Sequence, residues 1–177
     1  MREEVKGLTV IFTGNGKGKT SAALGAVMRA LGHGWKCKVI QFIKANRETG
    51  EILLLKKLAP ELGIEQFGMG FTWLKDHSPE EHREAAQAGF NAALADIRSG
   101  KYGLMVLDEI LYALGKGLVS LADVQEAIRQ KPSHMHLILT GRGAPQELIE
   151  MADMVTSMEP VKHPMEKGIP AQRGLDF

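Results

Sequence analysis

The stretch Thr13-Gly14-Asn15-Gly16-Lys17-Gly18-Lys19-Thr20-Ser21 decides the fold of this chain. The run Leu8 to Phe12 precedes it and has the apolar, β-branched composition of a buried strand. The alanine-rich run Ala22 to Leu31 follows it and has the composition of a helix. Strand, glycine-rich loop and helix in this order are the context in which a phosphate-binding loop is expected.

Each residue type in this stretch suits a role in holding phosphate. Glycines let backbone N–H groups approach phosphate oxygens, a helix N-terminus adds its positive dipole end, Lys19 supplies a cation, and Thr20 offers a hydroxyl to magnesium. We expect Lys19 to lie on an exposed loop. The usual pattern, G-x-x-x-x-G-K-[ST], has glycine where this chain has Thr13, which leaves the path of the loop at its entry open. The alternative is a turn that binds nothing, but such a turn has no use for two lysines. The predicted nucleotide-binding residues are Gly14, Asn15, Gly16, Lys17, Gly18, Lys19, Thr20 and Ser21.

A second segment, Leu104 to Glu109, is an apolar run that ends in two carboxylates. This pattern is typical of a buried parallel strand that delivers acids to the carboxyl edge of a sheet. Asp108 and Glu109 are therefore predicted, together with the Thr20 hydroxyl, to hold Mg²⁺. The alternative is that both acids only favour the start of a following helix.

The whole chain predicts an α/β fold. Strands alternating with helices favour a P-loop, RecA-like three-layer sandwich with a mostly parallel sheet. Ser78 and Pro79 form a helix start, while the tail from Val161 to Phe177 is too rich in Gly and Pro to be a helix. The expected strands are 8–12, 38–42, 64–67, 104–109, 135–139 and 154–157, and the expected helices are 22–31, 51–58, 79–98, 121–130 and one that begins near 145.

Length and composition limit the class of protein. The 177 residues fit a single domain, 1–177, and a net charge of +1 gives no electrostatic case for nucleic acid or an anionic membrane. The sequence has no apolar stretch near the ~20 residues of a membrane span and no signal region, so a cytoplasmic location is expected. Cys37, the one cysteine, is expected in the core or at its edge, although the flanking lysines would make it reactive if they lowered its pKa.

Two further loops contain candidate site residues. Arg142, in Thr140-Gly141-Arg142-Gly143, follows an expected strand and is predicted to meet phosphate, unless it is a turn residue in solvent. Phe71 and Trp73 lie in Gly68-Met69-Gly70-Phe71-Thr72-Trp73, where aromatics at this spacing usually fill the core below. The histidines, His134 and His136 included, lack the spacing of a metal site.

Taken together, these motifs closely resemble those of the corrinoid adenosyltransferases of the bacterial cobalamin pathway. The resemblance runs from about Leu8 to Phe177 and includes the absence of the first loop glycine. Members often have some twenty more residues at the N-terminus, proposed to close over the site, so the manner of closure here stays open. The matching motifs are Phe12 to Thr20, Gln41-Phe42-Ile43-Lys44, Gly70-Phe71-Thr72-Trp73, Leu107-Asp108-Glu109, Thr140 to Gly143, Val161-Lys162-His163-Pro164 and Gly174-Leu175-Asp176-Phe177.

The resemblance implies a reaction in which ATP and a reduced corrinoid, cob(I)alamin or a cob(I)yrinic precursor, give the adenosylated corrinoid and triphosphate. Lys19, Arg142 and Mg²⁺ would then stabilise the departing triphosphate. Phe71 and Trp73 match the aromatic pair that displaces the lower axial ligand of cobalt(II), which eases its reduction. The resemblance also implies a reduced flavoprotein or free flavin as electron donor, and a homodimer.

Two other functions stay open at this stage. A P-loop ATPase or small-molecule kinase would need only the loop, Asp108 and Glu109. A non-catalytic carrier that binds ATP and a corrinoid would need the same binding residues but would leave ATP unchanged.

Overall fold

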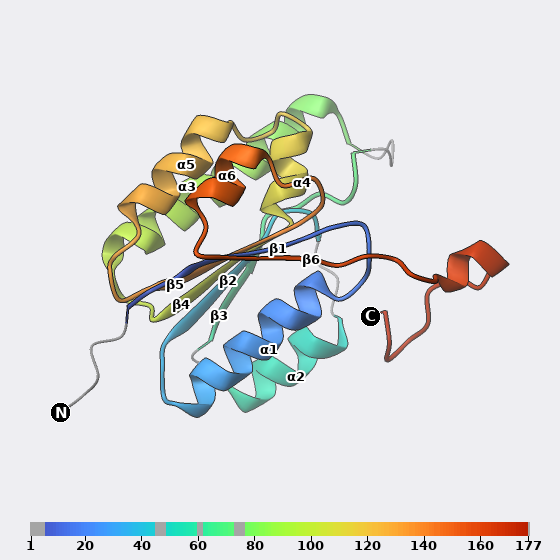
Figure 1. The fold of residues 1–177 in the computed structure, drawn as a ribbon, viewed down its shortest axis with the longest axis horizontal. Helices are drawn as coiled ribbons and strands as arrows, with labels where there is room; N and C mark the ends of the chain where they lie inside the picture. The colour runs from blue at the N-terminus through green and yellow to red at the C-terminus, as the bar shows by residue number, and fades with distance from the viewer. Residues whose placement is uncertain (1–5, 45–48, 60–61, 73–76, 177) are drawn as a thin grey trace.

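Six parallel strands form one sheet with helices on both faces (Figure 1). The structure is a computed structural model that describes residues 6–44, 49–59, 62–72 and 77–176. The expected α/β class and its mostly parallel sheet are therefore confirmed. The strands are β1 (Thr9–Thr13), β2 (Cys37–Gln41), β3 (Gly63–Gln66), β4 (Leu104–Asp108), β5 (His136–Thr140) and β6 (Met154–Ser157), in the spatial order β3-β2-β4-β5-β1-β6.

The helices form the two outer layers. In Figure 1, α1 (Lys19–Gly32) and α2 (Gly50–Leu58) cover one face of the sheet. The other face carries α3 (Pro79–Ser99), α4 (Ile110–Gly115), α5 (Leu121–Gln130) and α6 (Gln146–Met151). Each face has its own apolar core, because successive residues of a strand point to opposite sides. In β4, for example, Val106 packs in the core under α1 while Met105 and Leu107 pack in the core under α3 to α6.

The ends of the long helix α3 follow the sequence signals closely. The Ser78 hydroxyl accepts a hydrogen bond from the Glu81 N–H at 3.2 Å, and a Glu81 carboxylate oxygen accepts one from the Ser78 N–H at 2.7 Å. This reciprocal pair satisfies N–H groups that have no partner inside the helix. Pro79 occupies the first turn, and Gly100 ends the helix with φ 63°.

Two short elements differ from the expectation. Helix α4 lies directly after the acidic strand, where the sequence offers a helix only as an alternative, because six residues are too few to show a helical period. The tail contains the 3₁₀ turn η1 (Pro164–Lys167), closed by the His163 side chain, which accepts a hydrogen bond from the Met165 N–H at 3.1 Å. A proline in its first turn and a glycine after it limit this turn to one short piece.

Cys37 lies in the core, fully buried in β2. Burial raises the pKa of its thiol to about 11, because the charged thiolate is disfavoured away from water. The alternative that the flanking lysines activate this cysteine is therefore wrong, since desolvation outweighs any effect of their charge.

None of the helices in the described part of the chain is long and apolar enough to cross a membrane.

The strand order brings β4, β5 and β1 side by side in the sheet. The loops that leave the carboxyl ends of these three strands are therefore neighbours, and they contain the phosphate loop, the two acids and Arg142.

Candidate active site

The phosphate loop connects β1 to α1 through a tight backbone path. Gly14 has φ 90° and Gly18 has φ 108°, a region of conformation that only glycine adopts without strain. A Cβ at Gly14 would also lie 2.4 Å from the Met158 carbonyl oxygen. The Gly16 N–H donates to that same carbonyl at 2.6 Å, so the segment after β6 holds the loop from one side.

Thr13, which replaces the usual first glycine, is the last residue of β1 and is nearly buried. Its hydroxyl accepts a hydrogen bond from the Ala144 N–H at 3.2 Å, and its carbonyl accepts one from the Met158 N–H at 2.9 Å. The positive φ that opens the loop falls on Gly14 instead. A threonine is therefore accommodated here because its side chain ties the phosphate loop to the turn that contains Arg142.

Lys19 is buried, with 7% of its surface exposed, so the expectation of an exposed loop lysine is wrong. Its ammonium group donates to the carbonyl oxygens of Gly14 at 2.8 Å and Gly16 at 2.7 Å. Burial lowers the pKa of Lys19, the nearby charge of Glu109 opposes this, and the charge of Arg142 adds to it. The cation is thus held inside the curve of the loop, where a phosphate group would lie.

Asp108 is the hub of a buried hydrogen-bond network at the end of β4. One of its carboxylate oxygens accepts from the Thr20 hydroxyl and from the Thr140 hydroxyl, each at 2.8 Å. The other oxygen accepts from the Gln41 side-chain amide at 3.0 Å. Gln41 lies opposite Asp108 in the register of β2 and β4, and its own amide oxygen accepts from Gln66. The carboxylate therefore connects the loop, three neighbouring strands and, through Gln66, a fourth.

Glu109 plays a different structural part from Asp108. It adopts φ 62° and caps the start of α4, and its N–H donates to the Thr140 hydroxyl at 2.8 Å. Burial raises the pKa of its carboxyl and the adjacent Asp108 adds to this, while Lys19 and Arg142 act in the opposite direction. Glu109 thus stands at a helix start, as the N-cap residue of α4, whereas Asp108 ends its strand inside the network.

The donor set at this point fits a magnesium ion. A threonine hydroxyl and a carboxylate, 2.8 Å apart, are the oxygen ligands that Mg²⁺ accepts. No group of three or more His, Cys, Asp or Glu side chains in the described ranges is arranged to hold a metal alone. A cation here would therefore need further ligands from water or from a nucleotide, as Mg²⁺ in phosphate sites usually does.

Arg142 follows β5 on an exposed turn between Gly141 and Gly143. Burial has the largest effect on the pKa values of Lys19 and Glu109, and the charge of Arg142 is near enough to lower both. The structure therefore brings Arg142 to the same edge as the phosphate loop. Asn15 and Ser21 have exposed side chains, on the loop and in the first turn of α1.

The loop that contains Phe71 is fixed from two sides. The Gly70 N–H donates to the Ile43 carbonyl at 2.8 Å, and the Thr72 N–H donates to the Tyr112 hydroxyl at 3.1 Å. Phe71 packs edge-on against the Tyr112 ring, with centroids 5.7 Å apart, yet 39% of its surface stays exposed. Phe71 is therefore not a core residue. Trp73, the second predicted aromatic, lies outside the described residues.

The C-terminal tail returns to the phosphate loop, close to the start of α1 (Figure 1). Lys17 forms an ion pair with Asp176, and the Gln172 N–H donates to the same carboxylate at 2.6 Å. This contact connects the end of the Gly- and Pro-rich tail to the phosphate loop.

Four residues of the site were given no role from the sequence: Gln41, Thr140, Tyr112 and Asp176. Gln41 and Thr140 are the last residues of β2 and β5, and each directly follows apolar residues, so a polar residue at the end of an apolar run was the available signal. Tyr112 and Asp176 gave no such signal, because their contacts are with residues distant in the sequence.

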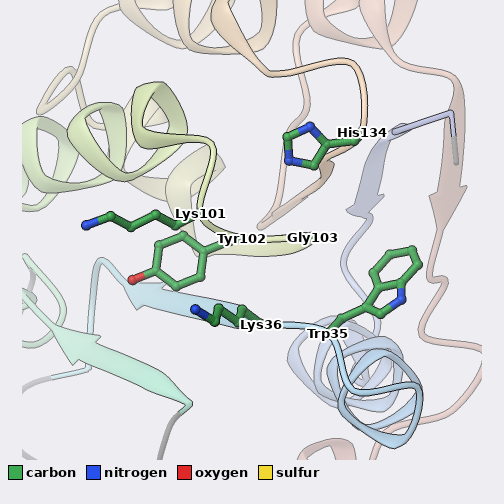
Figure 2. A pocket seen from close by; sticks show the side chains of 6 residues that line it. All are labelled: Trp35, Lys36, Lys101, Tyr102, Gly103 and His134. Atoms are coloured by element: carbon green, nitrogen blue, oxygen red, sulfur yellow. The ribbon is translucent and has the colours of Figure 1, made fainter.

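A separate cavity of about 290 Å³ lies at the opposite edge of the sheet (Figure 2). Its walls precede β2, β4 and β5, whereas the phosphate loop and the acids follow their strands. The cavity is therefore not part of the nucleotide site. It is lined by Trp35, Lys36, Lys101, Tyr102, Gly103 and His134.

Comparison with known proteins agrees with this geometry. Residues 5–177 match the sequence profile of the family described as "ATP:corrinoid adenosyltransferase BtuR/CobO/CobP". The chain is 41% identical over 172 residues to a corrinoid adenosyltransferase of Pseudomonas aeruginosa, covering 97% of this chain and 84% of that one. It is 35% identical over 175 residues to the corrinoid adenosyltransferase of Escherichia coli, and 37% identical over 182 residues to the corrinoid adenosyltransferase CobA of Salmonella typhimurium. Each of these two alignments covers 99% of this chain and 88% of the relative.

We predict that Lys19→Ala abolishes turnover and removes the stabilisation that Mg-ATP gives to the folded protein. The loss of a charge-assisted contact to phosphate costs about 1.5–3 kcal/mol of binding free energy. Because the carbonyls of Gly14 and Gly16 also lose their donor, we expect a lower melting temperature without ligand. Steady-state rates and thermal unfolding with and without Mg-ATP measure both effects. Lys36→Ala, at the opposite edge, is the matched control, and near-normal turnover of the Lys19 variant at saturating ATP would contradict the assignment.

Proposed function

The chain belongs to the ATP:corrinoid adenosyltransferase family, and on that premise we propose how its residues carry out the reaction. The enzyme transfers the 5′-deoxyadenosyl group of ATP to the cobalt(I) of a reduced corrinoid. A bond forms between cobalt and the ribose 5′ carbon, and the bond between that carbon and the triphosphate oxygen breaks. The electron pair of the broken bond leaves with the triphosphate.

The observation that best supports the site is the partly buried hydrogen bond between Thr20 and Asp108, near enough to the buried Lys19 for the Asp108 charge to act on its pKa. Charge develops on the triphosphate as it leaves, and preorganised cations and N–H donors stabilise such charge at no cost of reorganisation. We assign this role to Lys19, the N–H groups of the loop from Gly14 to Ser21, and Arg142. The loop then serves a leaving group rather than a transferred phosphoryl group.

We assign Mg²⁺ to the same place, held by the Thr20 hydroxyl and by Asp108, directly or through water, with Glu109 beside it. The bound ion would neutralise part of the triphosphate charge. Gln41 and Thr140 act on it indirectly, because their hydrogen bonds orient the Asp108 carboxylate.

The reaction itself needs little acid or base catalysis. Cobalt(I) is a strong nucleophile and carries no proton that must be removed. The task of the protein is therefore to hold the 5′ carbon in line with cobalt, since positioning of this kind removes much of the entropic cost of a bimolecular step.

Phe71 and Trp73 are proposed to face the lower side of the corrinoid and to displace its axial ligand before reduction. The partial exposure of Phe71 supports this, because its ring is accessible to a ligand. The Tyr112 side chain contributes by holding the loop, both through its ring and through its hydroxyl.

The remaining partners are proposals of the same kind. We propose that a reduced flavoprotein or free flavin supplies the electron, that the chain acts as a single nucleotide-binding domain, and that the reaction takes place in the cytoplasm, where ATP is available. A homodimer is supported by the edge strand β6, whose residues are exposed and include the apolar Met154 and Val155.

The phosphate product distinguishes this function from its two alternatives. With Mg-ATP and a reduced corrinoid alone, we expect intact triphosphate to appear in step with a light-sensitive cobalt–carbon bond, because attack at the 5′ carbon leaves the phosphate chain uncut. Phosphorus NMR and corrinoid absorbance measure the two products. An ATPase or kinase would form ADP, and a carrier would leave ATP unchanged. ADP as the stoichiometric product, independent of corrinoid, would contradict the adenosyltransferase.

Asp108→Asn tests the proposed magnesium site. We expect the Mg²⁺ concentration for half-maximal activity to rise by about tenfold or more, because a neutral amide is a poor ligand for a hard cation. Titration of activity with Mg²⁺ measures the shift, and Glu147→Gln, a change at an exposed carboxylate on α6, is the control. An unchanged magnesium requirement in the Asp108 variant would rule out this carboxylate as a ligand.

Phe71→Ala tests the role of the aromatic loop. We expect activity to fall mainly when the reaction starts from cob(II)alamin, and much less when strong chemical reduction supplies cob(I)alamin. The melting temperature should change little, because the ring is partly exposed. Equal losses of activity in both assays, with a clearly lower melting temperature, would instead indicate a packing role.

A further inference from the structure

A second cavity, of about 350 Å³, lies between the start of α3 and the end of α4, beside the aromatic loop. None of the nucleotide-binding residues assigned above lines it. Its walls combine basic side chains with one hydroxyl and two apolar residues. They are Thr72, His77, Pro79, His82, Arg83, Lys116 and Leu118.

His82 is the unusual member of this wall. Only 5% of its surface is exposed, and its Nε2 atom has no hydrogen-bond partner among the described residues. Its ring packs edge-on against His77 with centroids 6.0 Å apart, a contact that leaves the nitrogen unsatisfied. A buried polar atom without a partner costs free energy, and the residue that carries this atom is part of the cavity wall.

The charges of the wall indicate what kind of ligand this is. Arg83 and Lys116 are exposed cations, and within the described ranges no carboxylate lines the cavity. The acid in contact with the wall is Glu81, 3.8 Å from His77, but its carboxylate also accepts from Ser78 in the helix cap. Among the described residues the wall therefore carries positive charge, and the donors of Arg83 and Lys116 suit an oxyanion.

The position of the cavity indicates which molecule carries that anion. Thr72 belongs to its wall and is hydrogen-bonded to Tyr112, against which Phe71 packs. The cavity therefore adjoins the surface assigned above to the lower side of the corrinoid, whereas the triphosphate is assigned to the loop around Lys19.

We propose that this cavity is a subsite for an oxyanion at the periphery of the corrinoid, bound by the exposed cations Arg83 and Lys116, with His82 in its wall. The subsite rests on the reaction proposed above, and its preference for an anion determines which corrinoids the enzyme prefers. Two sources of the anion share this chemistry: the phosphodiester of a complete corrinoid such as cobalamin, and the free carboxylates of a precursor such as cobyrinic acid a,c-diamide. Cobinamide has neither group.

Arg83→Ala and Lys116→Ala test the subsite without disturbing the core, because both side chains are exposed. KM and kcat are measured for chemically reduced cobalamin, cobyrinic acid a,c-diamide and cobinamide at saturating Mg-ATP. We expect each variant to raise KM about fivefold for an anion-bearing corrinoid, as for an exposed ion pair, and to leave KM for cobinamide unchanged. The value of kcat should not change, because the cavity does not touch the reacting atoms. A higher KM for cobalamin alone identifies the phosphodiester as the bound anion. A higher KM for cobyrinic acid a,c-diamide alone identifies its carboxylates.

Equal changes of KM for all three corrinoids, or no change of KM for any of them, would contradict the proposed subsite. Lys101→Ala, an exposed lysine at the opposite edge of the sheet, is the matched control and should leave all three KM values unchanged. If the unmodified protein forms no adenosylated product from any of the three, the proposed function fails instead. In that case the dissociation constants of the same corrinoids test the subsite. The two variants should bind an anion-bearing corrinoid more weakly than the unmodified protein does, and should bind cobinamide equally well.

Discussion

The rest of the site depends on one buried carboxylate and the hydroxyl groups that donate to it. Asp108 is almost fully buried at the end of β4, and a carboxylate in that position is tolerated only when hydrogen bonds replace its water. Thr20 and Thr140 donate to one oxygen and Gln41 to the other. Because these donors come from α1, β5 and β2, satisfying the carboxylate also fixes the phosphate loop relative to the sheet.

The loop itself is shaped from outside as much as by its own glycines. The segment after β6 approaches so closely that the Met158 carbonyl takes the space of a side chain at Gly14 and accepts from the Gly16 N–H. The tail then returns to Lys17 through Asp176. The conformation of the nucleotide loop is therefore coupled to the last part of the chain, which ties the Gly- and Pro-rich tail to the site.

The proposed reaction divides between neighbouring parts of one sheet edge. The loop, Lys19 and Asp108 suit the triphosphate, and the loop of Phe71, held by Tyr112, suits the corrinoid. The basic cavity next to Thr72 extends the second part to the corrinoid periphery. Strands with fixed ends hold these groups, so a common scaffold for nucleotides can perform alkyl transfer to cobalt by changes in its loops.

The sequence by itself determined the layered α/β fold, the place of the glycine-rich loop between β1 and α1, and the limits of the long helix α3. These follow from local patterns: apolar runs, glycines at the loop and the Ser78 cap of α3. The sequence did not determine that Lys19 is buried, that Gln41 and Thr140 orient Asp108, or that α4 begins at Ile110, because these depend on strand register and on contacts between distant residues. Only the tertiary structure joined Lys17 to Asp176 and left the His82 Nε2 atom without a hydrogen-bond partner in the described part of the chain. The periodicity of apolar residues predicts which residues face the core. The hydrogen-bond and ion-pair partners of a polar residue depend instead on which segments the strand order brings together.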